Sequence, residues 1–222
     1  MVPVKTIISP VQRPVPLRQS VYDALVNLIA SGELQPGQHL VETDLAGQLG
    51  VSRQPIREAL HRMEAEGWID LRPSQGAFVH VPTATEVDEL LDVRELLEAE
   101  TARLAARNCD TAGLARLRAL WEDGQAAVKA GDLGAAATVN HAFHAQLAAV
   151  AGNTVLAALA GSVSRRVQWY YRMAAPVRGQ DSWAEHAELI DAIEVRDEER
   201  AQLLARAHTE GTRTAYHQAD HL

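Results

Sequence analysis

Three histidines in the second half of the chain fall on the apolar faces of separate predicted helices. They are His144, His186 and His208, each three or four residues from a leucine or isoleucine of the same face, and Asn140 shares the face of His144. Three imidazoles and an amide oxygen can surround one divalent cation, and imidazole suits zinc, nickel and similar ions. The alternative is three hydrogen-bonded core histidines, since spacing alone does not show that separate helices converge. The remaining histidines lack this placement and are expected at the surface: His39, His61, His80, His141, His217 and His221.

An arginine interrupts the apolar stripe of the first predicted helix in this half. Arg94 lies seven residues after Val87 and four after Leu90, so it faces the core. An unpaired buried charge is costly, so Arg94 needs a partner. That partner is either Glu98, one turn later, or the carboxylate of a ligand, which a guanidinium binds through two parallel hydrogen bonds.

The segment 43–60 has the spacing of a helix-turn-helix. The small Ala46 lets two helices cross closely, and Gly50 makes the tight turn between them. The second helix of such a motif presents its N-terminal residues to the DNA major groove, and here these are Ser52, Arg53, Gln54 and Arg57. They can bind phosphates and base edges. The alternative is a structural three-helix module whose exposed face carries two arginines by chance.

Composition changes near Pro82, where we place a domain boundary, because most prolines precede this point and most alanines follow it. Residues 1–16 read as a flexible arm. Residues 17–82 show the pattern of helices over 17–31 and 42–49, followed by a third helix that Ser52 caps and Gly67 ends. Two strands are predicted after it, over 68–72 and 77–81. This order is typical of a winged helix.

Residues 83–222 read as helical almost throughout, interrupted only by Pro176. Helices are predicted to begin near residues 83, 110, 132, 153, 181 and 197. Capping boxes are expected at Thr83–Glu86 and Ser182–Glu185, with caps at Asp110, Asp132 and Asn153. Short connections predict an antiparallel bundle. The fold class is therefore mainly α.

The whole chain has 222 residues, a formal net charge of -8 and one cysteine, Cys109. A single cysteine excludes an internal disulfide framework and fits a reducing cytoplasm. The chain has no apolar run long enough for a membrane span, and its start lacks the pattern of a secretory signal, so we expect a cytoplasmic protein without a membrane partner. Net acidity does not forbid DNA binding, which depends on locally placed Lys and Arg.

Three motifs, at residues 51–60, 64–69 and 76–79, resemble the winged-helix domain of the GntR superfamily of bacterial transcriptional regulators. The resemblance spans nearly all of residues 17–82. It implies that Ser52, Arg53, Gln54 and Arg57 contact operator DNA and that Gly76 lies at the wing tip near the minor groove. Thr43 stands where some members carry a DNA-contacting arginine.

The second half resembles the FCD ligand-binding domain of the FadR-type branch, through residues 93–98, 140–144, 151–153, 185–193 and 196–208. The resemblance implies an antiparallel helical bundle whose metal ligands are Asn140, His144, His186 and His208. Asn140 replaces the more usual aspartate, and a neutral amide attracts a cation less strongly.

Together these features predict a homodimeric transcriptional regulator that binds double-stranded operator DNA and is not an enzyme. Repression is the commoner outcome by resemblance. A small organic acid would bind in the bundle, through the metal ion and Arg94, and change operator affinity. One rival is a helical metalloenzyme with Glu185 or Glu188 as base. Another is an architectural DNA-binding protein without an effector.

Overall fold

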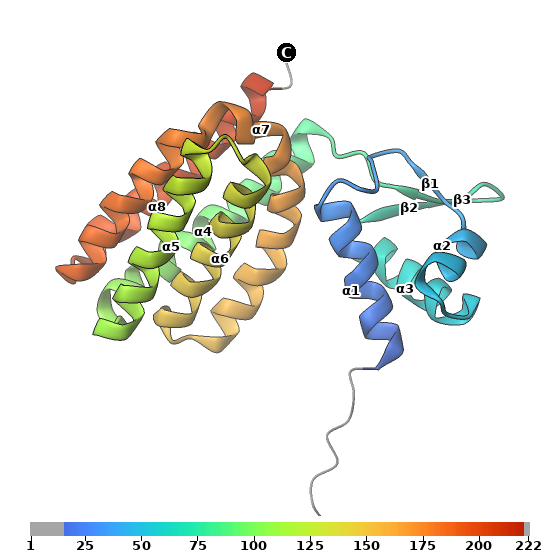
Figure 1. The fold of residues 1–222 in the computed structure, drawn as a ribbon, viewed down its shortest axis with the longest axis horizontal. Helices are drawn as coiled ribbons and strands as arrows, with labels where there is room; N and C mark the ends of the chain where they lie inside the picture. Colours follow the sequence, from blue (N-terminus) through green and yellow to red (C-terminus); the bar gives the residue numbers. More distant parts are fainter. Residues whose placement is uncertain (1–15, 220–222) are drawn as a thin grey trace, which may run out of the picture. The chain divides into compact units, whose positions relative to one another are not determined.

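The computed structural model describes the backbone of residues 16–219 and the side chains of residues 16–167, 169 and 178–218. The predicted arm, residues 1–16, lies almost wholly outside this range, as does His221. The chain divides into two compact units, Met1–Val81 and Pro82–Leu222. Figure 1 shows three helices and a small sheet in the first unit and a helical bundle in the second.

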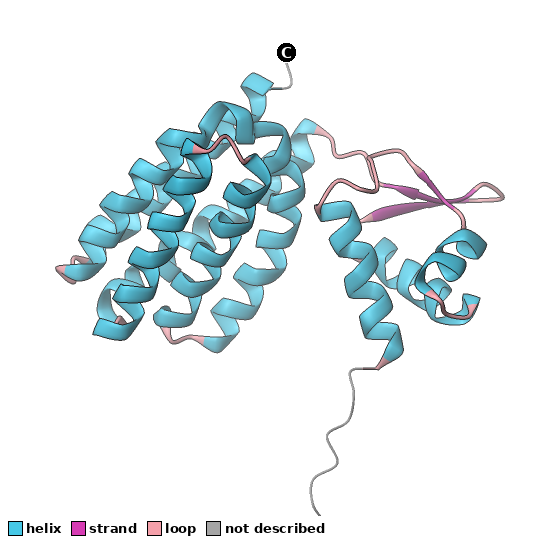
Figure 2. Cartoon of the chain, in the orientation of Figure 1, coloured by secondary structure: helices cyan, strands magenta, loops and turns pink. Residues whose placement is uncertain are grey.

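The first unit is a winged helix. Its elements are α1 (Leu17–Ala30), β1 (His39–Leu40), α2 (Glu42–Leu49), α3 (Arg53–Ala65), β2 (Ile69–Arg72) and β3 (Gly76–Val79). The strands form an antiparallel sheet in the order β1-β3-β2, drawn in magenta in Figure 2. The sequence predicted the β2–β3 hairpin, within one or two residues, but missed β1. A two-residue strand carries no alternating pattern that could reveal it.

Left-handed glycines end the helices of the helix-turn-helix. Gly50 follows α2 with φ 64°, and Gly67 follows α3 with φ 74°, as the sequence predicted for Gly67. The apolar faces then meet in one core, where Leu25 and Ile29 of α1 and Ile56 and Met63 of α3 are fully buried. The opposite face of α3 stays exposed at its N-terminal end.

The second unit consists of α4 (Ala84–Asn108), α5 (Thr111–Lys129), α6 (Leu133–Ala151), α7 (Thr154–Glu194) and α8 (Glu198–Ala219). The expected capping box at Thr83 is present, because the Thr83 hydroxyl accepts from the Glu86 amide and the Glu86 carboxylate accepts from the Thr83 amide. Asp110, Asp132 and Asn153 cap α5, α6 and α7 as predicted. The mainly α fold class is confirmed.

The prediction of a separate helix starting near residue 181 is wrong. Helix α7 continues from Thr154 to Glu194, with Pro176 and Ser182 inside it. Ser182 is therefore no N-cap; its side chain is buried. A proline removes one intrahelical hydrogen bond and crowds the preceding turn, which bends a helix without necessarily ending it. Figure 1 shows that α7 changes direction sharply at the top of the view.

Small residues let the helices of the bundle approach closely. Ala102, Ala105 and Ala106 of α4 are completely buried beside Phe143 and Ile190. Gly124 on α5 faces Trp183 of α7, and a Cβ at residue 124 would lie 2.0 Å from the indole ring. The indole therefore occupies space that only a glycine leaves free.

In the part of the chain that the structure describes, no helix is long and apolar enough to cross a membrane.

Gly124→Ala is expected to lower the free energy of unfolding by about 1–3 kcal/mol, because overpacking against Trp183 outweighs the gain in helix propensity. The matched control is Gly161→Ala in α7, where a Cβ meets nothing within 4 Å. That variant should gain up to about 1 kcal/mol. Urea unfolding measures the free energy of unfolding of both variants. Equal stability of the two variants would refute the close contact between residue 124 and Trp183.

Candidate functional site

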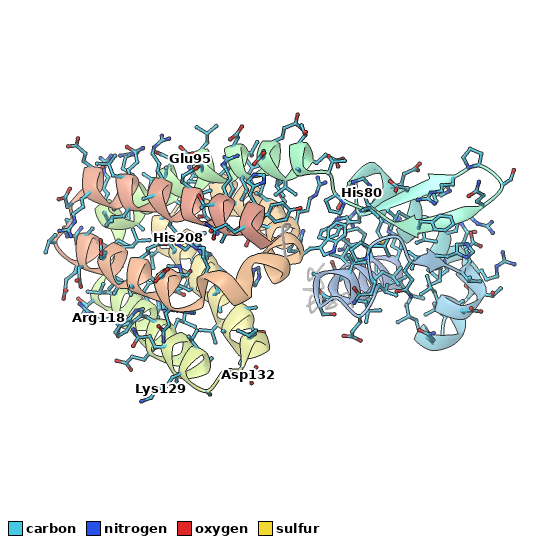
Figure 3. All side chains as sticks on the ribbon, turned by 90° about the horizontal axis from the view of Figure 1, so that it is seen from above. His80, Glu95, Arg118, Lys129, Asp132 and His208 are labelled. Atoms are coloured by element: carbon cyan, nitrogen blue, oxygen red, sulfur yellow. The ribbon has the colours of Figure 1, made fainter. Side chains whose placement is uncertain are left out.

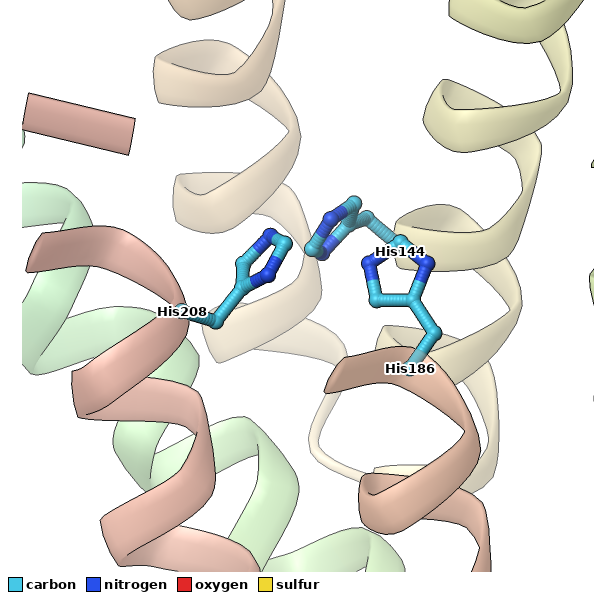
Figure 4. A group of neighbouring side chains, drawn as sticks. All are labelled: His144, His186 and His208. Atoms are coloured by element: carbon cyan, nitrogen blue, oxygen red, sulfur yellow. The ribbon is translucent and has the colours of Figure 1, made fainter. Parts of the chain in front are cut away.

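Three helices bring the predicted histidines to one point. His144 comes from α6, His186 from α7 and His208 from α8, and one possible ligand atom of each lies within 4.8 Å of the others. Figure 4 shows the three rings facing one another. Figure 3 shows His208 in the interior of the bundle, whereas Lys129 and Asp132 lie at its surface. The convergence that spacing alone left open is therefore present.

Burial keeps these imidazoles neutral. It lowers the pKa of His144 to about 3, lowers the pKa of His186 well below its ordinary value, and lowers the pKa of His208 despite a hydrogen bond to Glu185 that raises it. The ring of His186 also stacks on Phe143, with ring centroids 4.2 Å apart. A neutral imidazole has a free lone pair, so all three residues are in the protonation state that binds a metal.

Several polar atoms around this point are buried without a hydrogen-bond partner among the described residues. They are both ring nitrogens of His144, both ring nitrogens of His186 and the side-chain oxygen of Asn140. Buried polar atoms normally have partners, because an unmade hydrogen bond inside a protein is costly. These unpartnered ring nitrogens and this amide oxygen are atoms that could bind a ligand or metal ion from outside the chain.

Arg94 and Glu98 form a buried ion pair beside the histidines. Arg94 Nε donates to Glu98 Oε1 at 2.8 Å, and Thr209 donates to the second oxygen at 3.3 Å. Burial raises the pKa of Glu98, but Arg94 and then His144 outweigh this and lower it to about 2. Of the two partners that the sequence left open for Arg94, Glu98 is therefore present. The Arg94 Nη1 atom has no partner among the described side chains.

Two cavities adjoin this cluster. The larger, about 400 Å³, is lined by Glu98, His144 and a largely alanine wall from α6 and α7. The smaller, about 20 Å³, is lined by Arg94 and Asn140, among others. His141 lines both cavities. A volume near 400 Å³ is within the range of small-molecule sites.

Three of the histidines expected at the surface are instead partly buried. His141 is half-buried beside the cavities. His80 pairs with Asp70, with 2.8 Å between its Nδ1 and the carboxylate, and His217 pairs with Asp88 at 2.9 Å. Each has a carboxylate or cavity contact from another segment, which helix periodicity does not reveal. His39 and His61 are exposed, as predicted.

The second group of predicted residues lies at the start of α3. Ser52 is the N-cap residue, but its side chain makes no capping bond. Arg53, Gln54 and Arg57 are exposed, and Gln54 donates to Glu58 at 2.8 Å. A groove of about 380 Å³ runs past Arg53 and Arg57 to Gly76. The structure thus brings the helix and wing residues to one exposed surface.

Sequence reasoning missed Glu42 in this groove. Its carboxylate accepts from Arg53 Nη2 at 2.9 Å and from Arg57 Nε and Nη2 at 3.1 and 2.9 Å. These two arginines lower the pKa of Glu42 to about 2, with Arg57 contributing most. Glu42 precedes the arginines by 11 and 15 residues, so no local helix spacing could have linked them.

Gly76 occupies a backbone conformation that suits glycine, with φ 100°. A Cβ at this position would also lie 2.9 Å from Nε2 of His39. His39 in turn stacks on Phe78, with ring centroids 4.7 Å apart. The wing therefore needs a glycine at the point where β3 begins.

Glu98→Ala is expected to lower the free energy of unfolding of metal-free protein by about 3–5 kcal/mol, because it leaves the guanidinium of Arg94 buried and unpaired. Replacing both partners, as Arg94→Met with Glu98→Leu, should recover most of this loss. Urea unfolding in the presence of a chelator measures the three proteins. If the double variant were less stable than Glu98→Ala, the cost would not come from an orphaned charge.

Comparison with known proteins agrees with this architecture. Residues 17–79 match the family described as bacterial regulatory proteins, gntR family, and residues 89–211 match the FCD domain. The second match alone covers more than half of the chain. The resemblance drawn from the sequence is therefore confirmed for both units.

Relatives of known name and solved structures similar to this chain are transcriptional regulators. A probable D-xylose utilization operon transcriptional repressor from Paenarthrobacter nicotinovorans is 30% identical over 183 residues, which are 82% of this chain and 80% of that protein. The Nta operon transcriptional regulator of Aminobacter aminovorans is 31% identical over 144 residues, 64% of this chain and 67% of that one. The structure of Escherichia coli McbR/YncC superposes with a TM-score of 0.81 at 25% identity, covering 92% and 99% of the two chains.

These families and relatives are transcriptional regulators rather than enzymes, and an exposed helix-turn-helix with two arginines at its recognition end suits that role. The chain belongs to the GntR family of bacterial transcriptional regulators and joins a DNA-binding winged helix to an FCD domain.

Proposed function

We propose that the helical unit holds a divalent transition metal ion, zinc or nickel, and beside it a small carboxylate effector that controls operator binding. The observation that carries this proposal is the meeting of three neutral, buried imidazoles at one point. Imidazole nitrogens are preferred ligands of zinc, nickel and related ions. His144, His186 and His208 would be ligands.

Asn140 is proposed as the fourth ligand. Its side-chain oxygen is buried and has no hydrogen-bond partner among the described residues, and it stands four residues before His144 on the same face of α6. A bound ion would act as a Lewis acid that attracts carboxylate or hydroxyl oxygens of an effector. The neutral amide would make this site weaker than one with a carboxylate ligand.

Arg94 is proposed to recognise the effector. Its Nε donates to Glu98, but its Nη1 is buried and has no partner among the described side chains. Arg94 also lines the small cavity that Asn140 lines. A ligand carboxylate at Nη1 would pair this remaining donor. The neighbouring 400 Å³ cavity offers room for the rest of a small organic acid.

The DNA-reading residues are proposed to be Ser52, Arg53, Gln54 and Arg57 in the major groove, with Gly76 at the wing. The support is that all five residues are exposed and that Arg53, Arg57 and Gly76 line a single groove. A homodimer would present two such surfaces to half-sites about one helical turn apart. The name of the D-xylose operon relative supports repression as the outcome for this chain. The effector changes DNA affinity only if it binds two arrangements of the dimer unequally.

The two rival functions have no comparable support. A metalloenzyme would leave the winged helix unused. Of its two proposed bases, Glu185 is already held by Arg178 and His208, and Glu188 is exposed. An effector-independent DNA-binding protein would not need the buried cluster of histidines or the cavity beside it.

Metal content tests the core of the proposal. Chelator-treated wild type should take up one zinc or nickel ion per chain in elemental analysis, and His186→Ala should lose it. His61→Ala, which removes an exposed histidine of the other unit, should bind like the wild type. Asn140→Asp should bind more tightly because a carboxylate attracts a cation more strongly. Equal metal content in wild type and His186→Ala would eliminate this site.

DNA binding tests the recognition helix. Arg57→Ala should weaken specific binding to the gene's own upstream region by about 1–3 kcal/mol if Arg57 contacts a base edge. Fluorescence anisotropy at several salt concentrations measures the affinity and its salt dependence. The control Arg116→Ala makes the same change of net charge at an exposed position of α5. Equal losses of DNA affinity in both variants would show that Arg57 contributes only its net charge.

Effector recognition is tested by a thermal-shift screen of hydroxy, keto and sugar acids on the metal-loaded protein. An acid that raises the melting temperature of the wild type should raise it less in Arg94→Lys, which keeps the charge but loses the planar fork. The shift produced by metal alone should be the same in both proteins. Identical acid-induced shifts would exclude Arg94 as the recognition residue.

A further inference from the structure

Arg178 is a buried arginine that neither the metal ligands nor the effector cavity explains. It lies on α7, eight residues before His186, and only 6% of it is exposed. Its Nη2 donates to Glu185 and to the carbonyl oxygen of His208 at 3.1 Å. A guanidinium is costly to bury, so these bonds indicate a site arranged to hold it.

Helix α8 leaves room for this guanidinium at Gly211. A Cβ at residue 211 would lie 1.7 Å from Nη1 of Arg178. A glycine inside a helix costs about 1 kcal/mol relative to alanine, and Gly211 lies well within α8. The arginine and the glycine therefore fit each other across two helices, and any larger residue at 211 must displace Arg178.

Glu185 connects Arg178 to one of the three histidines. Its carboxylate lies 2.7 Å from Nδ1 of His208. An ionised carboxylate only accepts hydrogen bonds, so Nδ1 must carry the proton and Nε2 keeps the lone pair. Arg178 Nη2 is also 3.4 Å from Nδ1, but a protonated Nδ1 cannot accept from it, and the carboxylate is closer. The bond thus selects one tautomer and one ring orientation.

The other two histidines lack such a bond among the described residues. His186 has no hydrogen-bond partner at either ring nitrogen. His144 Nδ1 lies 3.3 Å from Glu98 Oε1 without forming a hydrogen bond, and that carboxylate already accepts from Arg94. His208 is therefore the histidine of this group whose ring is oriented by a carboxylate.

We propose that Arg178, Glu185 and Gly211 form a positioning relay for His208: Gly211 admits Arg178, Arg178 fixes Glu185, and Glu185 holds the His208 ring with Nε2 free for a metal ion. This inference rests on the proposed metal site and adds to it residues that are not ligands. A carboxylate that accepts from a ligating histidine fixes its tautomer and raises its basicity, and its loss weakens metal binding by 10- to 100-fold.

The test compares Zn²⁺ affinity, from competition with a chromophoric chelator, in wild type, Glu185→Ala, Glu185→Gln and Gly211→Ala. Glu185→Ala is expected to weaken Zn²⁺ binding by about 10- to 100-fold. Glu185→Gln should recover part of this loss, since an amide oxygen still accepts from Nδ1–H. Gly211→Ala should weaken binding although it alters neither a ligand nor the carboxylate. Glu188→Gln, exposed on the same helix, is the control and should bind like the wild type.

Two further readouts separate positioning from a loss of fold. The visible absorption spectrum of the Co²⁺-loaded protein should change in Glu185→Ala and Gly211→Ala, because the ligand geometry changes. Affinity of the metal-free variants for operator DNA should match that of the metal-free wild type. Wild-type Zn²⁺ affinity and an unchanged Co²⁺ spectrum in both variants would overturn the relay while leaving the metal site intact. Failure of the wild type to bind Zn²⁺ would overturn the proposed function and the relay together.

Discussion

Burial of charged and ring-nitrogen groups inside an alanine-rich bundle is the constraint on which this structure depends. Arg94, Glu98 and the three histidines are largely buried, so each must be neutral or paired. The imidazoles are neutral, and the ion pair keeps Glu98 charged at a pKa of about 2. The small residues of α4 allow the helices to pack closely. The same burial leaves ring nitrogens of His144 and His186 without partners among the described residues, and this supports the proposed metal ion.

Carboxylates organise both functional surfaces in the same physical way. Glu42 holds two exposed arginines at the end of the recognition helix, Glu98 holds Arg94 in the bundle, and Glu185 joins Arg178 to His208. In each case an acceptor with two oxygens restricts the rotamers of a long or rotatable side chain. Restricting them in advance lowers the entropy that a later ligand must overcome. If Arg53 and Arg57 contact DNA as proposed, the exposed carboxylate of Glu42 would compete with DNA phosphates for them, whereas the buried carboxylates would face no such competition.

Local signals in the sequence predicted much of the fold. The caps at Thr83, Asp110 and Asn153 follow from side chains that bond to amides three residues later, so nearby sequence suffices. The predicted bounds of α2 match the structure without such a bond, and the helix ends at the left-handed Gly50. The failures have equally local causes. The strand β1 is too short to show alternation, and Ser182 carries a capping pattern that is overridden because α7 continues through it. A cap pattern predicts a helix start only where the preceding residues leave the helix.

The sequence by itself determined the chemistry: which residues carry imidazole, guanidinium and amide groups, and which face of each helix they occupy. Periodicity reveals the face because side chains repeat every 3.6 residues. Only the tertiary structure decided which faces meet. The approach of His144, His186 and His208, the pairing of Glu42 with Arg53 and Arg57, and the fit of Arg178 over Gly211 all join segments at least 11 residues apart. Such contacts depend on how helices pack together, and packing is a property of the folded chain as a whole.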